Sequence, residues 1–278
     1  MPQYHRGTMQ DTSASPSSSP SFAAAPGPLP LVVLTGASRG MGLAMARQLL
    51  QGGHALVTLS RGTSSELEDI ARRTGMPLAQ WPQDLADGAQ AAARLRDWLQ
   101  SQPAGRYASA TLINNAGVVP RIAPLADSDP ADLANALRIG LEAPIQLTAA
   151  FLAATRGWGV PRKVLNISSG LGRRPMASQS AYCAAKAGMD HFTRCLALDE
   201  ARQPGGARVC SLAPGVIDTD MQVHLRGADP QVFPDVQNFA QLKSTGMLTS
   251  PDEAAVRVLA RLARPDFGDA PVADVREA

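Results

Sequence analysis

The chain has 278 residues and a mass of 29.1 kDa, which suits one large domain or two small ones. Its hydrophobic content of 45% is enough to bury a sizeable core, and its net charge of +2 gives no reason to expect nucleic acid or an anionic membrane as a partner. No run of the sequence approaches the roughly 18 consecutive apolar residues of a membrane span. These properties predict a globular protein that binds neither nucleic acid nor a membrane.

Residues 1–30 differ in composition from the rest of the chain. They contain six of the 22 prolines and the Ser/Pro run SASPSSSPS. Such a segment buries too little apolar surface to offset its chain entropy, and it lacks the charged start and continuous apolar core of a secretory signal. We expect a disordered tail over 1–30 and one folded domain over 31–278.

From residue 31 onward, short apolar runs alternate with longer helical patterns. In chain order, these patterns predict a strand at 31–35, a helix at 41–51, a strand at 55–60, a helix at 64–74, a strand at 77–82, a helix at 88–100, a strand at 110–114, a helix at 130–155, a strand at 163–168, a helix at 179–202, a strand at 208–212, a short helix near 233–242, a helix at 251–263 and a last strand near 272. Apolar runs in place of strict alternation indicate strands that are buried on both faces. The sequence therefore predicts a single α/β domain with a doubly wound parallel sheet.

Cysteine and histidine show no metal-site pattern. Cys183, Cys195 and Cys210 form no CxxC pair, and the four histidines lack the spacing of metal ligands. We expect no metal ion, and we expect reduced thiols in a cytoplasmic protein.

The first predicted strand ends in a glycine-rich turn. Residues 35–42 read TGASRGMG, with the spacing GxxxGxG, directly after a strand and before a helix. Such a turn lets the backbone approach a phosphate at the N-terminus of the helix. It predicts a dinucleotide site, the alternative being a glycine-rich turn without a ligand.

The end of the second predicted strand indicates which dinucleotide is bound. An acidic residue there would bind the ribose 2′-hydroxyl of NAD, but the sequence reads Ser60-Arg61. Arg61 and Arg39 could instead flank a 2′-phosphate, which predicts NADP(H). The alternative for either arginine is a solvated surface charge.

Tyr182 and Lys186 lie four residues apart on one face of a predicted helix. An ammonium stabilises a phenolate and lowers the pKa of Tyr toward neutrality, so the pair can exchange a proton with a carbonyl or alcohol oxygen. A YxxxK pair alone is common on helix surfaces. Here, however, Ser168-Ser169 ends a predicted strand, with Ser169 thirteen residues before the Tyr. Together these residues predict a catalytic site.

Five ordered motifs resemble the short-chain dehydrogenase/reductase family. They are TGxxxGxG at 35–42, NNAG at 114–117, Ser169, YxxxK at 182–186 and PG at 214–215, and they span about 31–220. The resemblance implies a single Rossmann-type domain, with a sheet of about seven strands and helices on both faces. It also implies an NADP(H)-dependent oxidoreductase that transfers a hydride between a nicotinamide cofactor and a C=O or CH–OH group.

The resemblance also implies a role for each site residue. Tyr182 would be the general acid, Lys186 would bind the nicotinamide ribose, and Ser169 would polarise the substrate carbonyl, with Ser168 as the weaker candidate. The residues predicted to bind the cofactor are Gly36, Ser38, Arg39, Gly40, Met41, Gly42, Arg61, Asp84, Asn115, Ala116, Gly117, Tyr182, Lys186, Pro214, Gly215, Val216, Ile217 and Thr219, with Asp84 against the adenine.

One position departs from the family pattern. The family usually has an Asn in the long helix before the Ser strand, where it marks a kink whose main-chain carbonyl holds a proton-relaying water. This sequence reads IGLEAP at 139–144, with Gly140 in that place. Gly and Pro144 also weaken a helix, so our hypothesis is that the relay survives through the backbone. A large gain in turnover from Gly140→Asn would contradict it. The competing interpretation is a slow or inactive enzyme.

The C-terminal third resembles sepiapterin reductases and bacterial benzil reductases. It contains PGVIDTDMQ at 214–222, FAQLKSTGML at 239–248, and a final strand with Asp274. The resemblance implies a vicinal dicarbonyl or pterin-like substrate that is bound by Ser169, Tyr182 and Asp274. The alternatives are an exposed Asp274 near the chain end, a 3-oxoacyl-type or other alcohol dehydrogenase of the same family, and a catalytically weak NADP-binding protein.

The same resemblance predicts the partners. In this family the two long helices, here 130–155 and 179–202, usually pack against a second subunit. We therefore expect a homodimer or homotetramer whose other partner is a small-molecule carbonyl compound.

Overall fold

The computed structural model describes residues 27–277. Up to residue 26 the predicted tail lies outside the described residues. The first strand begins at Leu29, two residues before the predicted start of the domain.

The centre of the fold is one sheet of seven parallel strands, in the order β3-β2-β1-β4-β5-β6-β7. The strands are β1 (Leu29–Thr35), β2 (Ala55–Ser60), β3 (Leu78–Pro82), β4 (Tyr107–Asn114), β5 (Arg162–Ile167), β6 (Arg208–Ala213) and β7 (Val272–Asp274). From β1 the chain adds β2 and then β3 on one side, and it then returns to add β4 on the other side of β1. The strand order therefore switches direction between β1 and β4. Parallel α/β sheets bind ligands at the carboxyl ends of the strands beside such a switch point.

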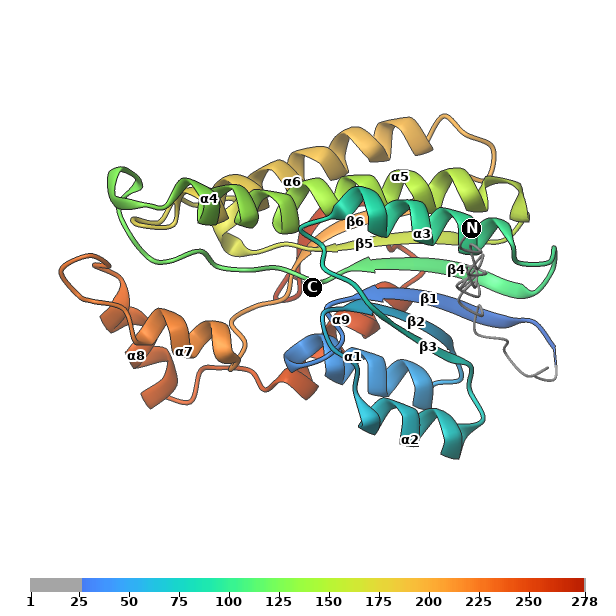
Figure 1. The fold of residues 1–278 in the computed structure, drawn as a ribbon, viewed down its shortest axis with the longest axis horizontal. Coiled ribbons are helices and arrows are strands. Elements are labelled where there is room, and N and C mark those ends of the chain that lie inside the picture. Colours follow the sequence, from blue (N-terminus) through green and yellow to red (C-terminus); the bar gives the residue numbers. More distant parts are fainter. Residues whose placement is uncertain (1–26, 278) are drawn as a thin grey trace, which may run out of the picture.

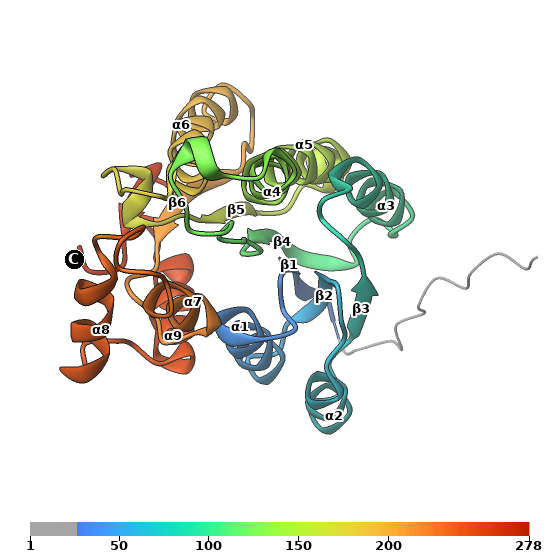
Figure 2. The same ribbon diagram turned by 60° about the vertical axis from the view of Figure 1, so that its left-hand side comes forward.

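Helices cover both faces of the sheet, as predicted (Figures 1 and 2). They are α1 (Gly40–Gln51), α2 (Ser65–Thr74), α3 (Gly88–Gln100), α4 (Pro130–Leu137), α5 (Ala143–Thr155), α6 (Ser180–Glu200), α7 (Asp220–Arg226), α8 (Val236–Ser244) and α9 (Pro251–Ala263). Helices α3, α5 and α6 lie on one face, and α1, α2 and α9 lie on the other. The predicted doubly wound Rossmann-type fold is therefore confirmed.

The two covered faces explain the continuous apolar runs of the strands. In β1, Leu31 and Val33 join the core cluster on one face, whereas Val32 and Leu34 join the cluster on the other. All four side chains are buried. A strand that is covered on both faces has no solvent-facing side, so its sequence does not alternate between apolar and polar residues.

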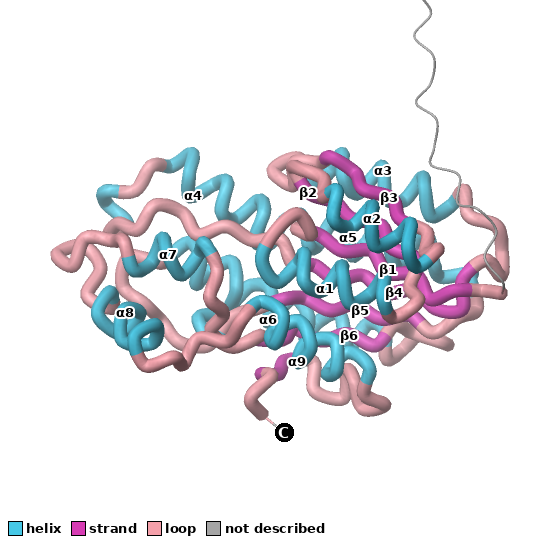
Figure 3. The backbone as a smooth tube through the Cα atoms, turned by 90° about the horizontal axis from the view of Figure 1, so that it is seen from below, coloured by secondary structure: helices cyan, strands magenta, loops and turns pink. Residues whose placement is uncertain are grey.

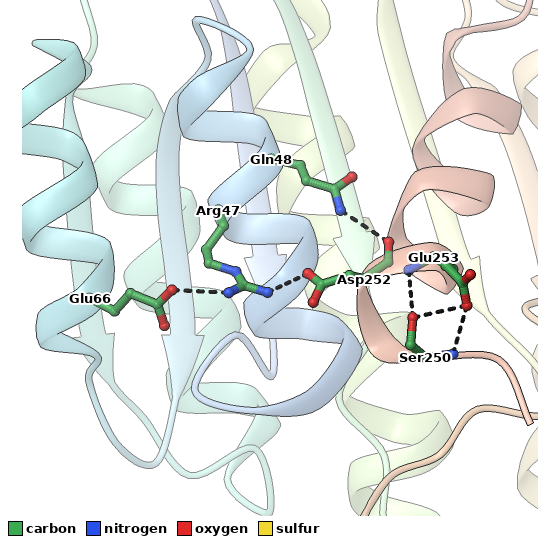
Figure 4. Close-up of polar contacts among 6 residues, drawn as sticks. All are labelled: Arg47, Gln48, Glu66, Ser250, Asp252 and Glu253. Atoms are coloured by element: carbon green, nitrogen blue, oxygen red, sulfur yellow. Dashed lines mark hydrogen bonds and ion pairs between the residues drawn. The ribbon is translucent and has the colours of Figure 1, made fainter.

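Helix α1 follows the glycine-rich turn and is braced by its neighbours (Figure 4). Arg47 bonds to Glu66 of α2 at 3.1 Å and to Asp252 of α9, whose backbone oxygen also accepts from the Gln48 amide at 3.1 Å. Helix α9 begins with a capping box in which Ser250 and Glu253 satisfy each other's backbone N–H groups. The position of α1 is thus fixed from both sides.

The helix predicted over 130–155 is not regular. It opens into a π turn at Arg138–Glu142, centred on Gly140, between α4 and α5. Among the described residues, one helical stretch, Pro130–Trp158, is long and apolar enough to cross a membrane by length and composition, a feature that the sequence analysis did not anticipate. Its residues Ala143, Leu147 and Phe151 are fully buried in the core cluster of the sheet, as in a core helix of a globular domain.

Helices α7 and α8 form a separate layer beyond the strand ends (Figure 3). Helix α7 was not predicted, and the helix predicted near 233–242 is found at Val236–Ser244. The α7–α8 segment, residues 220–244, has an apolar cluster of its own. This cluster consists of Ile122, Leu225, Phe233, Val236 and Phe239.

Candidate active site

A cleft of about 690 Å³ opens at the carboxyl ends of the strands, where the switch point predicts one. Its walls come from the glycine-rich turn, the ends of β2, β4, β5 and β6, and helices α6 and α7. Every residue predicted to bind the cofactor lines it, and so do Ser169 and Ser168. Asp274 does not. The structure thus brings together residues that are spread over more than 180 positions, from Gly36 to Thr219.

The backbone geometry of the glycine-rich turn disfavours a side chain at Gly36 and excludes one at Gly42. Gly36 has φ +70°, a left-handed conformation. A Cβ on Gly42 would lie 2.0 Å from the Gly36 carbonyl oxygen. The following helix has no acidic residue in its first turn, and Arg39 at its N-cap makes no side-chain cap. The N-terminal N–H groups of α1 therefore face the cleft without a competing side chain, which fits a phosphate group.

The NNAG motif holds this turn against β4. The Asn115 amide donates to the backbone oxygens of Thr35 and Gly36 at 3.0 and 3.1 Å. The Thr35 hydroxyl accepts from the backbone N–H groups of Asn115 and Ala116 at 2.9 and 3.0 Å. Asn114 lies deeper and donates to Asn166 of β5 at 2.8 Å. The hydrogen bonds of Asn115 and Ala116 therefore hold the glycine-rich turn in its conformation.

The charged residues near the turn lie at the mouth of the cleft. Arg39 pairs with Asp220 of α7 at 2.9 Å, and both side chains are mostly exposed. Arg61 lines the cleft at the end of β2, is exposed, and has no ion pair within residues 27–277. The Asp84 carboxylate accepts from the Ala86 N–H at 2.9 Å. The Arg61 guanidinium is thus free to pair with a group on the ribose of a dinucleotide bound in the cleft.

Tyr182 lies on α6 with only 8% of its surface exposed. Burial raises the pKa of its phenol, and a hydrogen bond with the Ser169 side chain partly counteracts this effect. This direction is opposite to the lowered pKa that the sequence predicts. The reason is that Lys186 Nζ donates to the Ile167 oxygen at 2.8 Å and lies 5.8 Å from the Tyr182 ring centroid. Within the described residues the ammonium makes no hydrogen bond to the phenol, although its other N–H donors stay available to a bound cofactor.

Lys186 is itself deeply buried, with 4% of its surface exposed. Burial lowers its pKa to about 8, although the carboxylate of Asp190 opposes the shift. Asp190 lies one turn further along α6, accepts from the Ser211 hydroxyl at 2.6 Å, and is 3.7 Å from Arg173. The sequence analysis missed Asp190. Its spacing of four residues from Lys186 is the signal that would have found it.

The two serines differ in their hydrogen bonding. Ser169 Oγ accepts from the Leu171 N–H at 3.2 Å and begins a short 3₁₀ turn. Ser168 is buried at the end of β5, and its Oγ has no partner in the described structure. Both line the cleft, but only Ser169 contacts the Tyr182 phenol.

Asp274 is buried, with 4% of its surface exposed, so the alternative of an exposed residue near the chain end is wrong. Its carboxylate is bound by the Arg276 guanidinium at 2.8 and 2.6 Å, which holds the pKa of Asp274 below its usual value. Arg276 lines the cleft in its place. A substrate could reach the Asp274 carboxylate only if this pair separated, because Arg276 occupies both carboxylate oxygens.

Gly140 lies in the π turn and faces α6. A Cβ at this position would lie 3.1 Å from the Cβ of Ala185, the residue before Lys186. The Gly140→Asn substitution therefore presses on the catalytic helix, and it changes packing as well as any proton relay.

Comparison with known proteins agrees with this geometry. The family model described as short chain dehydrogenase matches residues 30–229. The chain is 32% identical to a benzil reductase ((S)-benzoin forming) of Bacillus cereus over 88% of its length and 99% of that protein. It is 33% identical to the sepiapterin reductase of Meriones unguiculatus over 84% of its length and 92% of that protein.

A solved structure shares the whole fold. It is a putative 2-deoxy-D-gluconate 3-dehydrogenase from Agrobacterium tumefaciens with bound NADP, with 26% identity and a TM-score of 0.71 over 88% of this chain and 94% of that one. The family match covers six of the seven strands, β1 to β6, together with the glycine-rich turn and the Tyr–Lys helix. The chain therefore belongs to the short-chain dehydrogenase family and is an oxidoreductase that acts on carbonyl or alcohol groups with a nicotinamide cofactor.

Proposed function

We propose that this protein is an NADPH-dependent carbonyl reductase that transfers hydride to a ketone, in particular a vicinal dicarbonyl or pterin-like compound. The observation that carries the proposal is the convergence of Tyr182, Ser169 and Lys186 in the same cleft as the glycine-rich turn. A protein that only bound a dinucleotide would not need a buried phenol hydrogen-bonded to a serine at the end of β5.

A nicotinamide bound along the cleft would supply the hydride. Tyr182 would donate its phenolic proton to the carbonyl oxygen of the substrate, and Ser169 would hold that oxygen by a hydrogen bond. Lys186, tied to the Ile167 oxygen, would bind the ribose and place its charge near the developing oxyanion. The raised pKa of Tyr182 fits a phenol that is protonated at neutral pH and can serve as the proton donor in reduction.

The substrate class is supported by the two relatives named above. Benzil is an aromatic 1,2-diketone, and sepiapterin carries a side-chain ketone, next to a carbon that bears a hydroxyl, on a flat pterin ring. One cleft of about 690 Å³ has room for a dinucleotide end and a compact substrate of either kind.

The direct test follows the loss of NADPH absorbance at 340 nm with purified protein and either benzil or sepiapterin. Turnover on either compound supports the proposed reductase and shows which scaffold fits. Tight NADPH binding without turnover on any ketone would instead favour the catalytically weak NADP-binding protein.

Arg61 is expected to set the preference for NADPH over NADH, since a guanidinium at the end of β2 can bind a 2′-phosphate. We predict that Arg61→Asp lowers the ratio of kcat/KM for NADPH to that for NADH by about tenfold or more. Arg202→Asp, an exposed arginine away from the cleft, should leave the ratio unchanged. An unchanged ratio in Arg61→Asp would reject the assignment.

The pH dependence follows from Lys186. Its pKa of about 8 means that the ammonium is present below that pH and is lost above it, so reduction should decline above pH 8. The Asp190 carboxylate raises this pKa, and Asp190→Asn should therefore move the decline to lower pH. Asp199→Asn, an exposed acid on the same helix, is the matched control. Identical pH–rate profiles for Asp190→Asn and the wild type would contradict the role of Asp190.

The proposal includes a cytoplasmic homodimer or homotetramer. Leu137, Ile145 and Leu198 are exposed apolar side chains on α4, α5 and α6, the helices expected to meet a second subunit. Free thiols at Cys183, Cys195 and Cys210 support a reducing compartment.

A further inference from the structure

Gln179 is a buried amide that has no partner. It precedes the first residue of α6, and only 1% of its surface is exposed. Neither its Nε2 nor its Oε1 makes a hydrogen bond within the described structure, and the residue lines the cleft. Buried amides are almost always paired, because an unpaired donor and acceptor retain the whole penalty of leaving water. This side chain is therefore placed for something that enters the cleft.

The position of Gln179 links it to the reaction centre. Gln179 lies directly before α6, three residues before Tyr182 and seven before Lys186, and all three residues line the cleft. Gln179 is therefore part of the wall of the same cleft as the phenol.

The backbone before Gln179 is strained. Ser178 has φ +59°, and within residues 27–277 it is the one non-glycine residue with a positive φ. Its hydroxyl donates to the backbone oxygen of Val232, in the α7–α8 segment, at 2.6 Å. A strained backbone conformation persists only where the surrounding contacts hold it in place. Such residues are found most often at active sites and ligand-binding sites. The α7–α8 segment thus fixes the turn that buries the Gln179 amide.

A second unpaired amide oxygen comes from α7, another element that lines the cleft. Gln222 of α7 is buried, lines the cleft, and leaves its Oε1 without a partner. The substrate end of the cleft thus offers the full donor and acceptor set of Gln179 and one more acceptor from Gln222. A purely aromatic diketone, which has no hydrogen-bond donor, would leave these acceptors unpaired.

We infer that Gln179 is a specificity-determining residue that pairs with a lactam edge of the substrate, an N–H beside a C=O, next to the ketone that is reduced. This inference rests on the proposed function and narrows it. The carboxamide of Gln and a cis-lactam form two parallel hydrogen bonds, so both unpaired atoms of Gln179 are satisfied at once. The favoured substrates are therefore heterocyclic ketones that carry a lactam, ahead of benzil-like diketones.

Isatin and N-methylisatin test this inference as a matched pair. Both are cyclic vicinal dicarbonyls whose C3 ketone is reduced to an alcohol as NADPH is oxidised, but only isatin has the lactam N–H. The wild type should show a kcat/KM about tenfold higher for isatin than for N-methylisatin. Gln179→Met, similar in length but without a donor or a strong acceptor, should bring this ratio close to one. Gln237→Met, an exposed glutamine on α8, should retain the wild-type ratio.

Binding measurements separate this inference from the proposed function. Calorimetric titration of each isatin into the wild-type protein with NADP⁺ needs neither turnover nor a variant. Tighter binding of isatin without turnover would support the lactam contact and reject the reductase. Equal binding of both compounds, or a ratio that persists in a folded Gln179→Met variant, would overturn the inference. Folding of the variant is checked by its melting temperature and by NADPH binding.

Discussion

Replacing Tyr182 by Phe is expected to lower ketone reduction by about 10²–10⁴-fold while leaving NADPH binding nearly intact. The substitution removes one oxygen atom, and with it both the proton donor and the hydrogen bond to Ser169. The ring remains in its buried place on α6, so packing is conserved. The measurement is steady-state NADPH oxidation, together with a fluorescence titration of the cofactor.

The chain offers a matched control for this substitution. Tyr107 is also buried, but its hydroxyl lies beside Arg106 and Gln102, outside the cleft. Tyr107→Phe should keep wild-type turnover. If Tyr182→Phe retained more than about a tenth of the activity, the proton would have to come from another group, and the assignment of Tyr182 as general acid would fall.

Replacing Gly42 by Ala should abolish cofactor binding and destabilise the fold. The new Cβ would lie 2.0 Å from the Gly36 oxygen and 2.5 Å from the Asn115 amide nitrogen, so the turn must open or α1 must shift. Overpacking of this kind typically costs about 1–3 kcal/mol, and the upper end applies because a backbone atom is struck. Both the melting temperature and the dissociation constant for NADPH should report the change.

Gly62→Ala is the control for Gly42→Ala. Gly62 follows β2 with a negative φ, and a Cβ there meets nothing within 4 Å. Its stability and cofactor affinity should match those of the wild type. A Gly42→Ala protein that melted normally and bound NADPH normally would show that the turn has more room than its geometry implies.

The elements with strong local signals were predicted accurately from the sequence. Helices α3 and α9 were predicted with the bounds that the structure has. Both begin with a side-chain cap, from Asp87 to the Gln90 N–H and from Ser250 to the Glu253 N–H. Helix α7 was missed because Val223, one of its few apolar residues, is exposed, and its Leu225 packs in the cluster of Phe233. A seven-residue helix that depends on such tertiary contacts has no periodic pattern to detect.

In the candidate site, too, the residues with a local sequence signal could be predicted, whereas those that depend on tertiary contacts could not. The turn, Ser169, Tyr182 and Lys186 could be found because their spacing follows from the geometry of one strand end and one helix face. The unpaired state of Gln179 could not be found, because it depends on burial by segments distant in the sequence. The occupation of Asp274 by Arg276 was equally hidden, since it depends on how the chain turns after β7.

The apolar cluster of the α7–α8 segment shares no residue with the two clusters that pack against the sheet. Its members come from the loop after β4 and from residues 225–239. Because the two kinds of cluster are separate, substitutions at Leu225, Phe233 or Phe239 do not touch the apolar packing against the sheet, although Asp220 of α7 pairs with Arg39 of the glycine-rich turn. Changes in the apolar core of the α7–α8 segment can therefore reshape one wall of the cleft while the sheet keeps its own packing.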